Sequence, residues 1–235
     1  MTVNRPGLPG DLPPAEELWA RWALVAVLEA DTEAEGHGVH RSGHWIDAEG
    51  LHLDDCGCTW WTFAPMGGGR YVLYGEDESS AVKWHEPRVD MLAQGPEWLP
   101  YETLRDLLGS WELGCVYWSE DGTWARAPYP EDLDDDGLDC GMSRFTELPD
   151  LLHLLLYGTW DGCRCAPFED RQEAAARLLD AAVRRELTPG ALEELAAGCS
   201  CGHWDLPAML RALELSGLAQ GSADSPASPA SPVRG

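Results

Sequence analysis

The sequence predicts an α+β fold with an N-terminal helix, a mainly antiparallel sheet and a small helical C-terminal region. Three observations lead to this prediction. Apolar residues with helical spacing precede residue 30, short β-like runs separated by turn residues fill 38–127, and helical patterns bounded by Pro and Gly return near residue 149. Apolar residues make up 44% of the 235 residues, which is enough to build a hydrophobic core.

The first predicted helix is marked by Leu18, Trp22, Val25 and Leu28, which follow helical spacing. The thirteen residues before it include five Pro or Gly. We therefore expect residues 1–13 to form a flexible leader.

Six strands are predicted in three hairpins, because each pair of β-like runs flanks a turn-like segment containing Gly. The pairs are 44–47 with 51–54, 59–63 with 70–74, and 115–118 with 123–126. A short helix over Tyr101–Leu108 separates the last two hairpins and ends at Gly109.

Four further helices are predicted after an acidic loop. They span about 149–157, 169–186, 189–197 and 205–217, and the third begins with Thr188 as N-cap and Pro189 in the first turn. We divide the chain into an α+β domain over 14–158, a helical subdomain over 159–218 and a disordered Ser/Pro/Ala tail over 219–235.

The formal net charge is −25. A field of that sign repels phosphates and anionic lipids and attracts basic proteins, so we expect a basic protein partner, no nucleic acid and no membrane. Solubility alone also explains the charge, and this alternative stays open. The sequence contains no stretch of about 20 apolar residues and no apolar signal-peptide core, so we expect a cytoplasmic location.

Three Cys-x-Cys pairs form the pattern that composition does not predict, because eight cysteines placed at random would give about a quarter of one such pair. Two thiolates separated by one residue can bind the same Zn²⁺, and a His two residues after the last pair extends it. The candidate ligands of a structural zinc ion are Cys56, Cys58, Cys163, Cys165, Cys199, Cys201 and His203. Metal-free buried or loop thiols and a redox pair are the alternatives.

How the pairs combine depends on helix lengths. Helices over 169–186 and 189–197 would be about 27 Å and 14 Å long, so an antiparallel hairpin would leave the Cys199 pair about 13 Å short of the Cys163 pair. One site from those four thiols needs a shorter first helix or a bend. Joining the Cys199 pair to Cys56 and Cys58 is the other grouping, and both stay open.

Four of the seven histidines lie close together in the sequence, namely His37, His40, His44 and His52. His44 shares one face of its predicted strand with Ile46. His52 would share a face of the next strand with Cys56 and Cys58. Convergence of these faces would create a metal centre, so a metal-dependent enzyme with a site around 37–58 is an alternative function. Solvated loop histidines are the other interpretation, and no established catalytic motif occurs.

Residues 132–137 read Asp-x-Asp-x-Asp-Gly, the pattern that opens an EF-hand calcium loop. The twelfth position is Ser143 instead of a bidentate Glu, and Pro128 and Pro130 replace the incoming helix. We therefore expect a solvated acidic loop rather than a calcium site.

These features favour a non-catalytic interaction protein that binds a basic protein through acidic and Trp-bearing surface. Immunity proteins and antitoxins that neutralise basic nucleases have this physical profile. The segments 99–101 (Leu-Pro-Tyr) and 145–148 (Phe-Thr-Glu-Leu) resemble short pieces of SUKH-type immunity proteins, although their order and spacing do not follow that family. The resemblance covers only these residues and implies a partner-binding role. A metal-stabilised structural or adaptor module is a further alternative.

Overall fold

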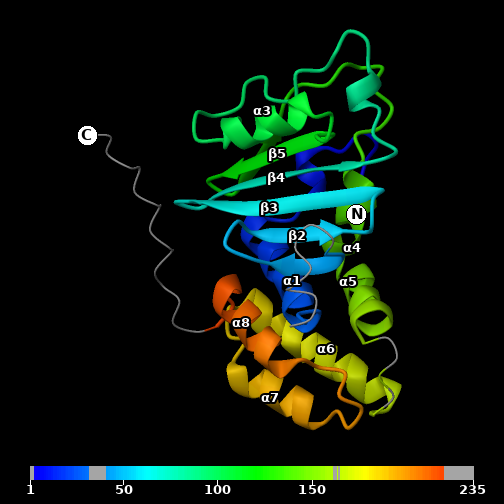
Figure 1. The fold of residues 1–235 in the computed structure, drawn as a ribbon, viewed down its shortest axis with the longest axis vertical. Coiled ribbons are helices and arrows are strands. Elements are labelled where there is room, and N and C mark those ends of the chain that lie inside the picture. The colour runs from blue at the N-terminus through cyan, green and yellow to red at the C-terminus, as the bar shows by residue number, and fades with distance from the viewer. Residues whose placement is uncertain (1–2, 32–40, 161–162, 164, 220–235) are drawn as a thin grey trace, which may run out of the picture.

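The computed structural model describes residues 3–31, 41–160, 163 and 165–219. Six strands in these residues form one antiparallel sheet, in which each strand pairs with its neighbours in sequence (Figure 1). The strands are β1 (Gly43–Ile46), β2 (Leu51–Asp54), β3 (Thr59–Gly67), β4 (Arg70–Asp77), β5 (Cys115–Glu120) and β6 (Thr123–Arg126). The predicted hairpins and the α+β fold class are confirmed. Residues 220–235 of the predicted tail lie outside the described residues.

Helices and helical turns precede, interrupt and follow the sheet. They are η1 (Pro9–Asp11), α1 (Ala15–Leu28), η3 (Val82–Trp84), α3 (Tyr101–Gly109), α4 (Leu138–Thr146), α5 (Leu148–Leu154), η4 (Leu155–Thr159), α6 (Phe168–Val183), α7 (Pro189–Ala197) and α8 (Leu206–Ser216). The predicted start of α7 is confirmed, because Thr188 Oγ1 accepts a hydrogen bond from the Ala191 N–H at 3.2 Å. None of the helices in the described ranges has the length and apolarity needed to cross a bilayer.

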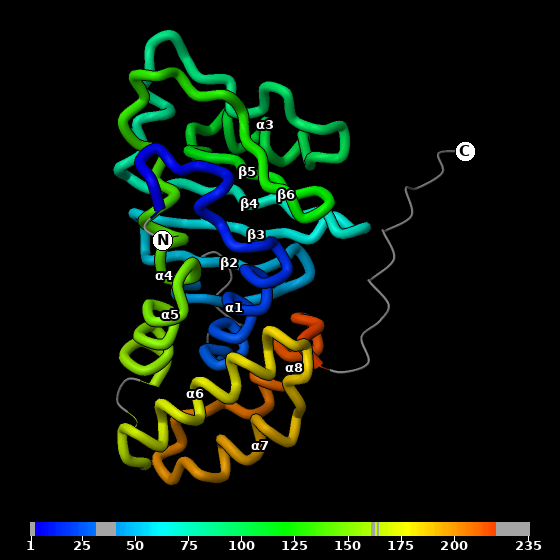
Figure 2. The backbone as a smooth tube through the Cα atoms, turned by 180° about the vertical axis from the view of Figure 1, so that it is seen from behind, coloured from blue at the N-terminus to red at the C-terminus, as the bar shows by residue number. Residues whose placement is uncertain are grey.

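Helix α1 is the centre of the molecule. Every residue from Leu18 to Leu28 is buried. The sheet covers one side of the helix, and α6 and α8 cover the other (Figures 1 and 2). Trp19 Nε1 donates a hydrogen bond to the Ser216 carbonyl at 2.8 Å and so ties α1 to α8. Apart from Arg21, every residue from Leu18 to Leu28 is apolar, and a helix with apolar residues on all sides must be covered on all sides, which explains why both the sheet and the C-terminal helices pack on α1.

Both faces of the sheet are covered at strands β3, β4 and β5. Phe63 and Leu73 face α1 and share a core with α6, α7 and α8, so residues on both sides of position 158 belong to one apolar cluster. Val72 and Val116 face the opposite side and pack with Leu104 of α3 in a second cluster. The sheet is therefore the middle layer between α1 and the α3 region (Figure 2).

Helix α4 is not among the predicted helices, because the sequence indicates only an acidic loop before the helix expected from about residue 149. Gly137 has φ 79°, a left-handed conformation that starts the helix at low cost for a glycine. A Cβ added at Gly141 would lie 2.1 Å from Trp61 Nε1, so the backbone of α4 touches the indole directly. Close packing on Trp61 thus supports a helix whose own sequence carries weak helix signals.

Residues 3–13 pack against the sheet, in contrast to the flexible leader expected from their Pro and Gly content. Val3 is buried. The Gly7 carbonyl lies 2.7 Å from the Tyr117 hydroxyl and accepts a hydrogen bond from Arg126 Nε at 2.9 Å. The Gly7 N–H donates to Asp136 Oδ1 at 2.9 Å. These bonds hold the N-terminal segment against the sheet and the acidic segment.

Candidate metal centre

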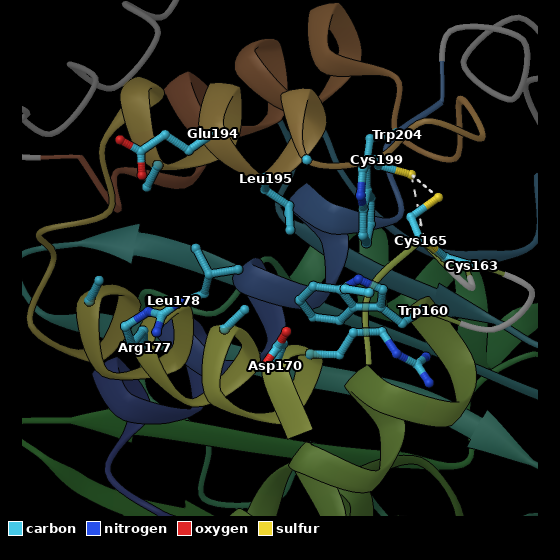
Figure 3. A pocket seen from close by; sticks show the side chains of 16 residues that line it. Trp160, Cys163, Cys165, Asp170, Arg177, Leu178, Glu194, Leu195, Cys199 and Trp204 are labelled. Atoms are coloured by element: carbon cyan, nitrogen blue, oxygen red, sulfur yellow. Dashed lines mark hydrogen bonds between the residues drawn. The ribbon is translucent and has the colours of Figure 1, made fainter. Parts of the chain in front are cut away.

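Two of the three Cys-x-Cys pairs meet at one end of the α6–α7 hairpin. Cys163 and Cys165 precede α6, and Cys199 and Cys201 follow α7. The Cys163 N–H donates a hydrogen bond to the Trp160 carbonyl at 3.2 Å. Figure 3 shows the sulfur atoms of Cys165 and Cys199 pointing toward each other from the two loops.

The four sulfur atoms form one compact cluster. All four Sγ atoms lie within 4.8 Å of one another. Cys199 Sγ is 3.1 Å from that of Cys201, 3.5 Å from that of Cys163 and 3.8 Å from that of Cys165. The thiols are free, and even the shortest separation exceeds the roughly 2.05 Å of a disulfide bond. A tetrahedral ion with metal–sulfur bonds of about 2.3 Å holds its sulfurs about 3.8 Å apart, so these four residues can bind a metal with small adjustments.

The α7–α8 loop closes the distance that helix lengths alone would leave. Helix α6 has 16 residues and α7 has 9, which gives about 24 Å and 14 Å. Residues 198–205 continue beyond α7 toward the start of α6 before they turn into α8 (Figure 1). The Cys163 and Cys199 pairs can therefore share one site, because the loop over 198–205 spans the distance that the shorter helix α7 leaves.

Hydrogen bonds among the thiols of the cluster shift their pKa values in opposite directions. Hydrogen bonds with Ser200 and Cys201 lower the pKa of Cys165 to about 6. Hydrogen bonds with Cys199 and Cys165 raise the pKa of Cys201 to about 12. The cluster therefore favours a thiolate at Cys165, and a bound cation would displace the protons of the other thiols.

His203 supports the loop and lies outside the sulfur cluster. Its Nε2 donates a hydrogen bond to the Thr159 carbonyl at 2.8 Å. Its ring lies edge-on to Trp204 with centroids 4.4 Å apart, and Trp204 in turn lies edge-on to Trp160 at 5.1 Å. The group of residues with ligand atoms close enough for one ion consists of the four cysteines without His203.

Cys56 and Cys58 lie in the exposed turn between β2 and β3. The backbone N–H of Cys56 donates to Asp54 Oδ1 at 2.7 Å, and that of Cys58 donates to Asp55 Oδ1 at 3.1 Å. A hydrogen bond and repulsion from Glu78 raise the pKa of the Cys58 thiol. The structure does not bring this pair into the four-cysteine group.

The histidines around β1 and β2 do not converge. His44 is opposite Leu53 and His52 is opposite Trp45, which puts the two imidazoles on opposite faces of the sheet. His44 is buried, with Nδ1 2.8 Å from Glu29 Oε2. His52 stacks on Trp45 with centroids 5.1 Å apart. The shared face that the sequence suggested is therefore wrong for this pair, while His37 and His40 lie outside the described residues.

The carboxylates of the acidic segment serve as acceptors for protein donors. Asp136 is fully buried, and its Oδ2 lies 2.8 Å from the Tyr117 hydroxyl. Asp135 accepts from the Gly137 N–H at 2.8 Å. Asp132 Oδ1 lies 3.1 Å from His85 Nε2. Asp135 and Asp136 thus anchor the chain, whereas Asp132 and Asp134 are exposed, so the expectation of a solvated acidic loop holds for only part of the segment.

A cavity of about 430 Å³ adjoins the cysteine cluster between α6 and α7. Trp160, Arg171 and Trp204 are part of its wall. The sequence analysis did not single out these residues. A signal was present, because Trp160 lies three residues before Cys163 and Trp204 lies three residues after Cys201.

Comparison of the chain with family models, with curated proteins and with solved structures found no significant match.

Proposed function

We propose that this chain is a non-catalytic interaction protein. In this proposal one structural zinc ion holds the ends of its C-terminal helices, and an acidic, Trp-bearing surface binds a basic protein partner. The observation that carries the proposal is the four-cysteine cluster formed by two loops that lie far apart in sequence.

The donor set favours zinc in a structural role. Four thiolates satisfy the tetrahedral coordination of Zn²⁺ completely and leave no position for a substrate or water. Catalytic zinc sites usually combine three protein ligands with one open position. The cluster joins the segment before α6 to the segment after α7, so a bound ion would restrain both helix ends.

The charge and two exposed indoles support a basic partner. The net charge is −25. The side chains of Trp84 and Trp111 are 71% and 48% exposed, and their rings lie 5.6 Å apart. The Arg88 guanidinium lies over the Trp111 ring at 4.5 Å, so one of these rings already accommodates a cation. Exposed Trp side chains on a chain of strongly negative net charge are suited to an Arg-rich or Lys-rich protein surface.

Metal content tests the zinc site. Elemental mass spectrometry of untagged protein purified without chelator should give about one zinc per chain. The double variant Cys163→Ser/Cys199→Ser should lose the ion, and the matched control Cys56→Ser/Cys58→Ser should keep it. A wild-type protein without zinc, or equal zinc in the first variant, would contradict this part of the proposal.

Affinity capture from a lysate tests the partner. A basic protein should be retained at about 0.1 M salt and released near 1 M, where the Debye length falls to about 3 Å. The variant Trp84→Ala/Trp111→Ala should lose that protein, and the exposed control Tyr157→Ala should retain it. Retention that does not depend on the two indoles, or a captured partner that is acidic, would contradict the proposed surface.

A further inference from the structure

The cavity between α6 and α7 has the size and lining of a small-molecule site. Its volume of about 430 Å³ lies within the range of about 300–1,000 Å³ that is typical of such sites. Figure 3 shows Trp160, Leu178, Leu195 and Trp204 around it. An apolar wall of this kind binds an apolar body and excludes water from any polar group beside it.

One charged side chain is built into this wall. Arg171 lines the cavity and is only 8% exposed. Its Nε is buried without a hydrogen-bond acceptor, and the part of the chain that the structure describes gives its guanidinium no ion pair. The guanidinium carbon of Arg171 lies 5.6 Å from the centroid of the Phe168 ring, which is a cation–π contact. A largely buried cationic side chain whose Nε lacks an acceptor is unfavourable, so a bound anion would gain from pairing with it.

A second buried arginine shows how this fold satisfies such a group elsewhere. Arg21 is 6% exposed. Its Nη1 donates to the carbonyls of Phe145 and Thr146 at 2.7 Å each, and its Nη2 pairs with Glu17. Arg171 has no comparable set of acceptors among the described residues. Arg21 therefore has a structural role, whereas Arg171 is available to pair with a ligand.

We infer that this cavity binds a small apolar carboxylate, with Arg171 pairing with the carboxylate and the Trp and Leu side chains enclosing the apolar body. A planar guanidinium matches a carboxylate with two parallel hydrogen bonds. A single anionic group is expected, because Asp170 and Glu194 at the exposed part of the lining would repel a dianion such as a phosphate monoester. Arg177 is not the anchor, since it is exposed and pairs with Glu173 at 2.7 Å.

Isothermal titration calorimetry with decanoate and with decanol tests the inference, on purified full-length protein whose metal content is measured on the same sample. Decanoate should bind saturably and more tightly than decanol, which has the same chain without the charge. Arg171→Met should weaken decanoate binding roughly 10- to 100-fold and leave decanol binding unchanged. Its melting temperature should not fall, because an apolar side chain replaces an unpaired buried cation.

Two further variants keep the test decisive. Arg177→Met, the exposed control, should bind decanoate as the wild type does. Leu195→Trp should fill the cavity and abolish binding of both compounds while Arg171 stays in place. Equal affinities for decanoate and decanol, no saturable binding of either, or unchanged decanoate binding by Arg171→Met would overturn the assignment.

Discussion

Removal of the zinc ion proposed for the four-cysteine cluster should lower the free energy of unfolding, and the size of the loss should depend on the length of the loop that the ion closes. A link between Cys163 and Cys199 closes a loop with a sequence separation of 36 residues. The chain-entropy relation for a cross-link of this span gives about 4 kcal/mol at 25 °C. For a chain of this length each kcal/mol corresponds to about 2–4 °C, so loss of the ion should lower the melting temperature by roughly 8–16 °C.

Thermal unfolding followed by circular dichroism, with and without a strong chelator, measures this shift. Cys163→Ser/Cys199→Ser should melt at the lower temperature in both conditions, because it lacks the cross-link from the start. Cys56→Ser/Cys58→Ser should behave as the wild type, since its thiols lie outside the cluster. A wild-type shift below about 2 °C, or an equal loss in the control variant, would refute the reasoning.

Three other substitutions test the packing described above, and urea unfolding measures each. Gly141→Ala should destabilise by about 1–3 kcal/mol, because its Cβ would lie 2.1 Å from Trp61 Nε1; an unchanged midpoint would show that α4 can move away. Tyr117→Phe should cost about 1.5–3 kcal/mol, since it removes the hydroxyl 2.8 Å from buried Asp136; a neutral effect would mean that another donor replaces it. Burial raises the pKa of Glu29, but hydrogen bonds from His44 and Thr159 outweigh it and lower the pKa from its usual 4.5. The advantage of wild type over Glu29→Gln should therefore be full above pH 4.5 and disappear as the pH falls through the lower folded pKa; a pH-independent difference would contradict this.

The strands could be predicted because each hairpin carries its own turn signal. Which side chains of β1 and β2 lie on the same face of the sheet could not be predicted. The sequence suggested a three-residue turn over 48–50, which would put His44 and His52 on one face. In the structure Ile46 pairs with Leu51, so the turn has one more residue. A slip of one residue moves every side chain of a strand to the other face. The Asp47 N–H donates to the Gly50 carbonyl at 3.0 Å within that turn, a detail that composition does not reveal.

The cysteine spacing identified the ligand candidates, but the grouping depended on the path of a loop. Helix lengths follow from periodicity, whereas the direction of residues 198–205 depends on contacts such as that of His203 with the Thr159 carbonyl. Helix α4 could not be predicted for a similar reason, since Gly141 lowers helix propensity locally and is required by contact with Trp61 from a distant strand. In both cases the deciding contact joins residues that are far apart in sequence.

The position of α1 has a consequence for how the chain is made. This helix is translated first among the long elements, yet the partner of Trp19 is Ser216, 197 residues later. At about 5–20 residues per second, roughly 10–40 s of synthesis separate the two. During that interval the side of α1 that packs on α8 has no permanent cover, so the nascent chain should depend on chaperones until α8 leaves the ribosome.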